Sequence, residues 1–295
     1  MKKLFAGTGV AMVTPFDNDN RIDFASLSKV IKNLIDNGVD YLVLMGTTGE
    51  YPCVSEQEKI AVLEFTRKEV AGRIPIVYGI GGNNTSLVLE KIRTFDFSGI
   101  DAILSVTPSY NKPTQEGLYR HFSEIAAISP VPVILYNVPG RTSVNMLPKT
   151  TLRLAKEFKN IIGIKEASGN IESSMEIIKN KPEGFIVISG EDSLNLPLIS
   201  IGAEGVISVV GNAFPKECSD LVSYAIKGEF NKALPIHYKL LDATHLMFEE
   251  GNPTGVKAFM SELGMIKNNL RLPLVPASEI LMNKIKEEIK IKFNR

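Results

Sequence analysis

Lys165 ends a short apolar run that begins at Ile161, and this placement is the strongest chemical feature of the sequence. Burial disfavours a charged ammonium, so such a lysine tends toward the neutral amine, the form that attacks a carbonyl. Because side chains alternate along a strand, we expect Ile161, Gly163 and Lys165 to share one face, with open space at Gly163 below the amine. The alternative is a structural lysine that pairs with an acid such as Glu166 or Glu191.

Polar side chains also end or follow other apolar runs of the chain. Thr47 and Thr48 follow the second run, and Tyr110 follows the fourth. Tyr136 ends the fifth run, and Arg141 follows it. If these runs end at one rim, the chain offers an amine nucleophile, phenolic proton carriers and groups that bind anions. Schiff-base chemistry on a keto acid needs these parts.

Eight short apolar runs recur along the chain, and amphipathic stretches typical of helices separate them. The runs cover residues 9–13, 41–45, 74–79, 102–106, 131–136, 161–165, 185–189 and 205–209. The helical stretches cover residues 24–37, 55–71, 85–95, 114–128, 148–158 and 171–180. Near-continuous apolar strands indicate a parallel sheet covered on both faces. The pattern predicts an α/β fold, a (β/α)8 TIM barrel, with its active site at the C-terminal ends of the strands.

The apolar strand pattern stops after about residue 225, and helical patterns follow over residues 229–248, 253–263 and 277–291. We therefore expect residues 1–225 to form a catalytic barrel and residues 226–295 to form a helical extension packed on it. The rival architecture is a doubly wound open sheet. It would usually carry a glycine-rich phosphate turn after the first strand, where this chain has Thr14-Pro15-Phe16-Asp17.

The composition favours a soluble enzyme that binds small metabolites. Of the 295 residues, 33 are Lys or Arg and 33 are Asp or Glu, so no overall field directs the chain to nucleic acid or an anionic membrane. No apolar stretch is long enough to cross a bilayer. The first five residues lack the pattern of a signal peptide, and Cys53 and Cys218 are the only cysteines. We expect a cytoplasmic location without disulfides.

Two competing chemistries fit the sequence less well. All three histidines, His121, His237 and His245, fall in helical patterns away from the strand ends, so no metal site is expected there. A pyridoxal-phosphate enzyme would also form a lysine Schiff base, but it needs a phosphate cradle near the last strands. The segment 211–213 gives little support for one. The sequence therefore predicts an enzyme that uses neither cofactor nor metal.

Four motifs, in order and spacing, resemble the dihydrodipicolinate synthase family. They are Gly-Thr-Thr-Gly-Glu at 46–50, the segment 107–115 with its Tyr-Asn-Lys-Pro core, Tyr-Asn-Val-Pro-Gly-Arg-Thr at 136–142, and Gly-Ile-Lys-Glu-Ala at 163–167. The resemblance extends from Gly7 to Pro273. It implies a Schiff-base-forming lyase of lysine and diaminopimelate biosynthesis that condenses pyruvate with L-aspartate 4-semialdehyde. It also implies a homotetramer built as a dimer of dimers.

The resemblance assigns catalytic roles to residues already noted. Lys165 would form an imine with pyruvate, which isomerises to an enamine and attacks the semialdehyde. Tyr136, Thr47 and Tyr110 would form a proton relay, with Tyr110 reaching in from a neighbouring subunit. A non-catalytic relative serving as a binding or structural protein is a further alternative. The filled catalytic positions argue against it.

The resemblance also assigns substrate-binding residues. Thr48 would hold the pyruvate carboxylate and Arg141 the semialdehyde carboxylate, while Gly190 and Ile207 would line the pyruvate pocket through backbone groups. The same superfamily contains N-acetylneuraminate lyase and 2-keto-3-deoxygluconate aldolase, which are the alternative activities. A sugar-acid aldolase needs partners for hydroxyl groups where this chain has Arg141, so the arginine favours the synthase.

Two departures from the family pattern affect contacts between subunits. The family usually has two adjacent tyrosines, whereas this chain has Ser109 before Tyr110. Many family members are inhibited by lysine bound in a cleft at the dimer interface. The matching positions here are Tyr51, Pro52, Glu56, Lys59, Asn83, Leu87 and Ser109. Leu87 replaces an expected carboxylate and Lys59 adds a like charge, so we expect insensitivity to lysine unless Glu56 compensates. The helical position of Glu56 should turn it toward solvent.

Overall fold

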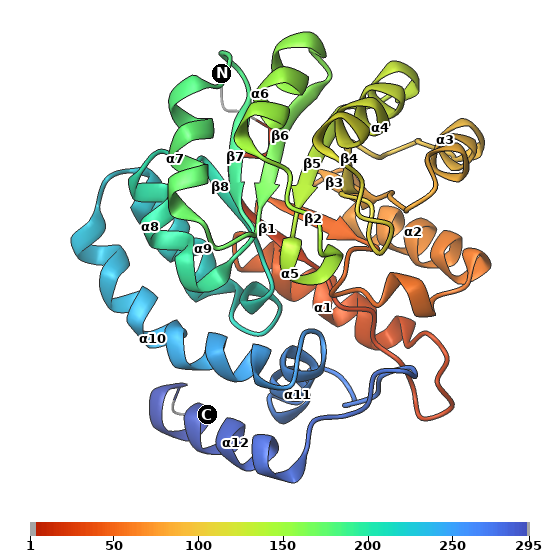
Figure 1. Cartoon of the computed structure of the whole chain (residues 1–295). Coiled ribbons are helices and arrows are strands. Elements are labelled where there is room, and N and C mark those ends of the chain that lie inside the picture. The colour runs from red at the N-terminus through yellow and green to blue at the C-terminus, as the bar shows by residue number, and fades with distance from the viewer. Residues whose placement is uncertain (1–3, 294–295) are drawn as a thin grey trace.

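Eight parallel strands pair in sequence order, and the last strand pairs with the first to close a barrel (Figure 1). The computed structural model describes residues 4–293, so the first three residues of the N-terminal segment considered above lie outside the described part. The strands are β1 (Gly7–Ala11), β2 (Tyr41–Leu44), β3 (Ile76–Gly79), β4 (Ala102–Val106), β5 (Val133–Asn137), β6 (Ile161–Glu166), β7 (Ile186–Ser189) and β8 (Gly205–Ser208). The predicted TIM barrel is confirmed, and each strand lies within two residues of its predicted start.

Helices surround the barrel on its outside (Figure 1). Those that follow the strands are α1 (Phe24–Asp36), α2 (Glu56–Val70), α3 (Thr85–Thr94), α4 (Gln115–Ile128), α6 (Pro148–Glu157), α7 (Ile171–Asn180), α8 (Asn195–Ser200) and α9 (Pro215–Ile226). Short turns of helix follow β5 as α5 (Pro139–Thr142), and 3-10 turns lie at Tyr51–Cys53, Asp192–Leu194 and Val210–Asn212. The sequence pattern predicted six of the eight outer helices and missed α8 and α9, which both contain a proline in their first turns.

Local sequence signals explain where several helices begin. Ser55 caps α2 by accepting from the backbone N–H of Glu58, whose side chain accepts in turn from the Ser55 backbone. This reciprocal pair satisfies two N–H groups that the first turn leaves free. Pro148 stands in the first turn of α6, where its missing N–H is not needed.

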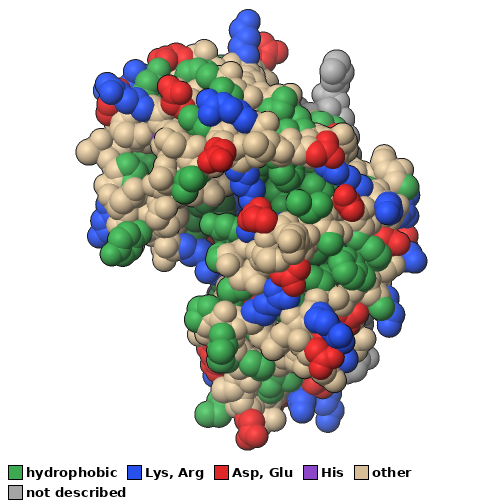
Figure 2. All heavy atoms as spheres, turned by 90° about the vertical axis from the view of Figure 1, so that its right-hand side faces the viewer, with side chains coloured by type: hydrophobic (Ala, Val, Ile, Leu, Met, Phe, Trp, Pro, Cys, Tyr) green, Lys and Arg blue, Asp and Glu red, His purple; other side chains and the backbone are tan. Residues whose placement is uncertain are grey.

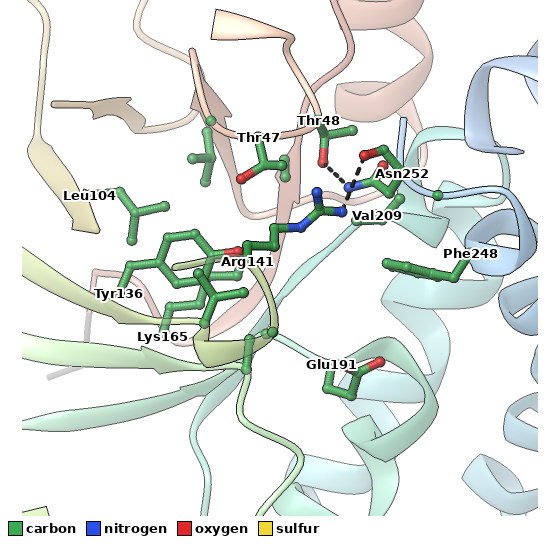
Figure 3. A pocket seen from close by; sticks show the side chains of 18 residues that line it. Thr47, Thr48, Leu104, Tyr136, Arg141, Lys165, Glu191, Val209, Phe248 and Asn252 are labelled. Carbon is green, nitrogen blue, oxygen red and sulfur yellow. Dashed lines mark hydrogen bonds between the residues drawn. The ribbon is translucent and has the colours of Figure 1, made fainter. Parts of the chain in front are cut away.

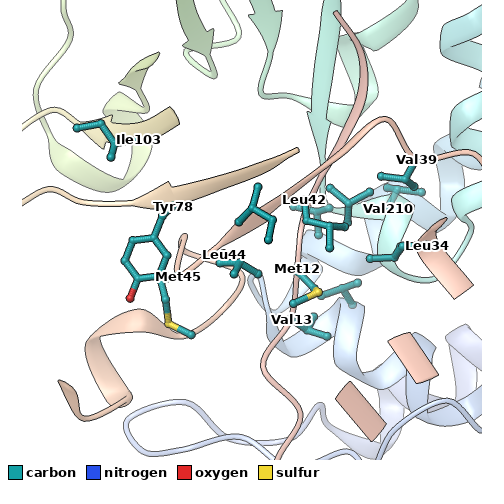
Figure 4. Packing of buried hydrophobic residues seen from close by; sticks show 14 of the residues in the cluster. Met12, Val13, Leu34, Val39, Leu42, Leu44, Met45, Tyr78, Ile103 and Val210 are labelled. Carbon is teal, nitrogen blue, oxygen red and sulfur yellow. The ribbon is translucent and has the colours of Figure 1, made fainter. Parts of the chain in front are cut away.

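Two hydrophobic layers hold the barrel together. The larger layer lies between strands and helices and includes Leu42 and Leu44 of β2 and Leu34 of α1 (Figure 4). A second cluster fills the inside of the barrel, where the fully buried Tyr41 donates its hydroxyl to the carbonyl of Val206 at 3.1 Å. The inside is therefore a packed core, and any binding site must lie at an end of the barrel.

Closure of the barrel requires a close backbone approach between β1 and β8. A Cβ atom at Gly205 would lie 2.5 Å from the carbonyl oxygen of Gly7, closer than any side chain tolerates. Gly7 itself has a φ of 101°, a backbone region that favours glycine. The seam between the first and last strands therefore depends on glycine at both sides.

Three further helices follow the barrel: α10 (Phe230–Glu249), α11 (Thr254–Glu262) and α12 (Glu279–Phe293). In Figure 1 they lie below the barrel, and the loop between α10 and α11 contacts the short helix α5 through the hydrogen bond from Arg141 to Asn252. The helical patterns predicted over residues 229–248, 253–263 and 277–291 are confirmed, while the division of the chain at residue 225 stays a prediction. Residues 294 and 295 of the predicted extension lie outside the described part. No helix among residues 4–293 combines the length and apolarity that a membrane span requires.

The charged side chains are distributed without a dominant sign. Figure 2 presents the face on the right of Figure 1, where acidic and basic groups lie interspersed. Ion pairs such as Arg67–Asp96 and Lys91–Glu56 bring opposite charges together on the surface of the molecule. This face therefore lacks the single-sign field that guides binding to polyanions.

Candidate active site

Lys165 lies in β6 with only 5% of its surface exposed, and its side chain enters the C-terminal end of the barrel. Its Nζ atom lies 4.3 Å from the centre of the Tyr136 ring on the neighbouring strand β5. Neither Glu166 nor Glu191 forms an ion pair with Lys165 in the described structure. Glu166 instead accepts hydrogen bonds from Asn137, at 3.1 Å, and from the backbone of Ser168, at 2.8 Å. The ion pair that the alternative of a structural lysine requires is therefore not formed among the described residues, although the charge of Lys165 acts on Glu191 from across the cavity.

The prediction of open space at Gly163 is also wrong. A Cβ atom there would lie 2.5 Å from Cγ1 of Ile186, which already fills that part of the barrel. Ile161 does not share a face with Lys165 either, because it belongs to the layer under the helices. The pairing of β5 with β6 shifts between Val133 and Ile134, and this irregularity breaks the simple alternation of side chains.

The glycine that makes room for Lys165 is Gly190, directly after β7. A Cβ atom at this position would lie 2.8 Å from Cε of Lys165 and 2.7 Å from Cβ of Ala167. Any larger residue at Gly190 would push the lysine side chain away. The neighbouring strand, rather than β6 itself, therefore leaves the space that the amine needs.

A cavity of about 330 Å³ opens above Lys165 at the C-terminal ends of the strands (Figure 3). Of the eight residues predicted for the site, six line it, namely Thr47, Thr48, Tyr136, Arg141, Lys165 and Gly190. Ile207 is fully buried in the cluster inside the barrel, below the cavity. The predicted convergence on one rim is therefore found for six of these eight residues, five of which have polar side chains.

Tyr110 does not join this cavity within its own chain. It lies in the loop after β4 with 90% of its surface exposed and a φ of 71°. A backbone conformation of this kind is uncommon for a bulky residue and holds the side chain away from the barrel. The monomer therefore presents Tyr110 outward.

Asn252 is a site residue that the sequence analysis missed. Its carbonyl oxygen accepts a hydrogen bond from Arg141 at 3.1 Å, and its side-chain amide donates to Oγ1 of Thr48 at 3.0 Å. Figure 3 shows Asn252 between these two groups, at the rim of the cavity. The residue lies between two helical patterns of the extension, and nothing in the local sequence connects that loop with the strand ends.

Glu191 and Phe248 complete the far side of the cavity. Burial raises the pKa of Glu191, and the negative charge of the adjacent Asp192 adds to this effect. The positive charges of Lys165 and Arg141 act in the opposite direction. Glu191 is therefore an acceptor that faces a cationic environment, and the sequence analysis considered it only as a structural partner.

The arrangement supports carbonyl chemistry on an anionic substrate. A buried amine faces a phenol and a threonine hydroxyl, so attack on a carbonyl and proton transfer can occur in one place. Arg141 provides a planar cation at the entrance, suited to a carboxylate. Within residues 4–293 there is no group of three or more His, Cys, Asp or Glu residues that could hold a metal ion.

Comparison with known proteins agrees with this chemistry. Residues 4–292 match the Dihydrodipicolinate synthetase family. A 4-hydroxy-tetrahydrodipicolinate synthase of Flavobacterium psychrophilum is 52% identical over 281 residues, which cover 95% of this chain and 96% of the relative.

Solved structures agree as well. A monomeric variant of dihydrodipicolinate synthase is 40% identical with a TM-score of 0.95, covering 97% of this chain and 96% of the other. A lysine-bound synthase of Cyanidioschyzon merolae is 33% identical with a TM-score of 0.93, covering 98% of both chains. By sequence and by structure, this chain belongs to the dihydrodipicolinate synthetase family.

Proposed function

We propose that the cavity above Lys165 condenses pyruvate with L-aspartate 4-semialdehyde, as a 4-hydroxy-tetrahydrodipicolinate synthase does. The observation that carries this proposal is a buried lysine that forms no ion pair within residues 4–293 and shares one cavity with Arg141. A lysine amine placed in a cavity in this way can attack a carbonyl carbon. The reaction belongs to lysine and diaminopimelate biosynthesis, and we expect it to take place in the cytoplasm.

The first half of the reaction builds the nucleophile. The Lys165 amine attacks C2 of pyruvate, and loss of water leaves an imine. Loss of a proton from C3 then gives an enamine. Tyr136 and Thr47, which line the cavity on either side, are the proton carriers, and Thr48 holds the pyruvate carboxylate.

The second half joins the substrates and frees the enzyme. The enamine carbon attacks the aldehyde carbon of the semialdehyde, whose oxygen takes a proton and becomes the 4-hydroxyl group. The amino group of the same substrate then attacks the imine carbon, closes the ring and displaces Lys165. Arg141 binds the carboxylate of this second substrate, and its bond to the Asn252 carbonyl holds the guanidinium at the rim. A sugar-acid aldolase would need hydroxyl partners at this place.

We also propose that the chain acts as a homo-oligomer, a tetramer built from two dimers. Tyr110 is outside its own cavity, and its exposure fits a residue that completes the cavity of a second subunit. The loss of the usual ring at Ser109 weakens one aromatic contact between the loops. The relative described as a monomeric variant indicates that association is usual in the family.

Lys165 is expected to carry the covalent intermediate. Borohydride reduction in the presence of pyruvate should add one reduced pyruvyl group per chain, and peptide mapping should place it on Lys165. Replacement of Gly190 by Ala should slow this labelling, because the added methyl group meets Cε of Lys165. Labelling of another lysine in the wild-type protein would overturn the assignment.

Replacement of Arg141 by Ala should impair use of the semialdehyde much more than labelling with pyruvate. Loss of a charged hydrogen-bond pair to a carboxylate costs about 2–4 kcal/mol, or roughly 30- to 1000-fold in kcat/KM. Arg120→Ala, on the exposed face of α4, is the control and should change neither step. Equal loss of pyruvate labelling would assign Arg141 to the first substrate or to structure.

Tyr110 can be tested by mixing inactive subunits. A Tyr110→Phe protein and a Lys165→Ala protein should each be nearly inactive, whereas their reassembled mixture should regain part of the activity. A mixed dimer contains one cavity with both native groups if Tyr110 acts across the interface. Absence of recovery after verified subunit exchange would mean that Tyr110 serves its own chain.

The enzyme should be insensitive to physiological concentrations of lysine. Glu56 has a side chain that is 68% exposed and pairs with Lys59 at 2.6 Å and with Lys91 at 3.2 Å, so it is occupied by cations of the chain itself. Leu87 offers no charge to a bound ammonium. Lysine inhibition curves at saturating and sub-saturating pyruvate test this, with the Cyanidioschyzon merolae enzyme for comparison. A sub-millimolar midpoint would contradict the proposal.

A further inference from the structure

Glu50 ends the loop that carries Thr47 and Thr48, and its partner comes from the C-terminal extension. The Glu50 carboxylate forms an ion pair with Lys257 of α11, and both side chains are fully buried. Lys257 also donates to the backbone carbonyl of Asn269 at 2.9 Å, and its Nζ atom lies 4.2 Å from the centre of the Phe16 ring. A buried pair of this kind requires every remaining polar atom to find a partner.

The second carboxylate oxygen of Glu50 accepts from the backbone N–H of Arg271 at 3.1 Å. The Arg271 guanidinium is directed elsewhere. It pairs with Glu58 of α2, which lowers the pKa of Glu58 to about 2, and it lies 4.3 Å from the centre of the Phe16 ring. Lys257 is therefore the cation that neutralises Glu50. The charged groups around Lys257 are Glu50 and, at longer range, Arg271.

The backbone of Glu50 explains why the loop needs this anchor. Glu50 has a φ of 53°, a left-handed conformation that costs free energy for a residue with a side chain and persists only where surrounding contacts impose it. Its backbone N–H bonds to the carbonyl of Thr47 at 3.1 Å, so the position of Glu50 and that of Thr47 are coupled. The Glu50 end of the loop is thus fixed by contacts outside the loop, and the bond to Thr47 transmits its position.

We propose that Lys257 is a positioning residue of the active site, which acts through Glu50 to hold Thr47 and Thr48 in place for pyruvate. This inference rests on the proposed function. Lys257 touches no substrate. It does not line the cavity, and its effect on the reaction passes through the backbone of the loop.

The protonation of Lys257 gives the proposal a signature in pH. Burial lowers the pKa of Lys257 to about 8, although Glu50 favours the charged form. In the unfolded chain the usual value of 10.5 applies, so between about pH 8 and 10.5 the unfolded state binds more protons. The contribution of Lys257 to stability therefore rises with pH in this window. The anchoring of the loop weakens in the same window, because the ion pair with Glu50 is lost.

The KM for pyruvate of the wild-type enzyme should thus increase above about pH 8, without a fall in thermal stability over the same range. A KM that stays level or falls as pH increases would contradict the proposal. This measurement needs no variant and holds even where a substitution prevents folding.

Variants separate positioning from stability. Lys257→Met leaves Glu50 as an unpaired buried carboxylate and should both destabilise the protein and increase the KM for pyruvate. The double variant Glu50→Gln with Lys257→Met removes both charges, and a neutral pair of similar size can restore stability. If Lys257 positions the loop, the KM for pyruvate stays about tenfold or more above wild type in the double variant, while Tm returns close to the wild-type value.

A matched control lies at the opposite end of the barrel. Lys181 pairs with Glu204 and donates to the Phe185 carbonyl at 2.7 Å, while Glu204 accepts from the Val187 backbone at 2.9 Å. This set of contacts has the same form as that of Lys257, but it lies at the N-terminal ends of β7 and β8. Lys181→Met, alone and with Glu204→Gln, should change Tm and leave the KM for pyruvate unaltered.

The results of these experiments distinguish a failure of the role of Lys257 from a failure of the proposed function. A double variant at 50 and 257 with restored stability and wild-type KM would make Lys257 a structural residue and overturn the proposal. Borohydride labelling of the wild-type protein with pyruvate is measured in parallel. Absence of labelling would count against the proposed function, whereas normal labelling with an unchanged KM in the double variant would count against the role of Lys257 alone.

Discussion

Closure of the sheet between β1 and β8 is the constraint on which the remaining structure depends. It requires the backbones of Gly7 and Gly205 to approach too closely for any side chain. Once the sheet is closed, the inside fills with apolar side chains and no room is left for a ligand along most of its length. The polar residues that end the strands are then forced to one rim, where their distances are set by the strand spacing. A cavity forms there because Gly190 leaves space for Lys165.

Two adjacent carboxylates near this rim, Glu191 and Asp192, have different surroundings. One faces the substrate cavity, and the other holds two strand ends together. Asp192 accepts from the Ser208 hydroxyl at 2.6 Å and from the backbone N–H of Val209 at 2.7 Å, so it joins the ends of β7 and β8. Glu191, one residue earlier, faces the cavity, and burial raises its pKa. Asp192, with several donors around it, has a structural task, whereas Glu191 accepts only from the Ser193 hydroxyl among the described side chains, at 3.4 Å, and faces the substrate cavity.

The C-terminal helices act on the same rim from outside the barrel. Asn252 links Arg141 to Thr48, and Lys257 secures the Glu50 end of the threonine loop. Both contacts join residues that lie more than a hundred positions apart in the chain. The extension therefore contributes to the geometry of the substrate site in addition to covering apolar surface. The ion pair between Lys257 and Glu50 is buried. Its contribution to stability therefore depends on whether all its polar atoms find partners, and not on charge attraction alone.

The sequence by itself determined the architecture and most of the rim, because both follow from local patterns. Apolar runs and helical periodicity predicted all eight strands, and their polar ends predicted Thr47, Thr48, Tyr136, Arg141 and Lys165. The tertiary structure decided those features that depend on residues distant in the sequence. An irregularity in β6 and the side chain of Ile186 removed the expected space at Gly163, and Gly190 from the next strand provided it. Asn252 lies in the loop between two helices and Lys257 lies within a helix, and neither belongs to a recognisable chemical motif. Their roles arise because folding brings the extension to the strand ends, a long-range contact that no local pattern encodes.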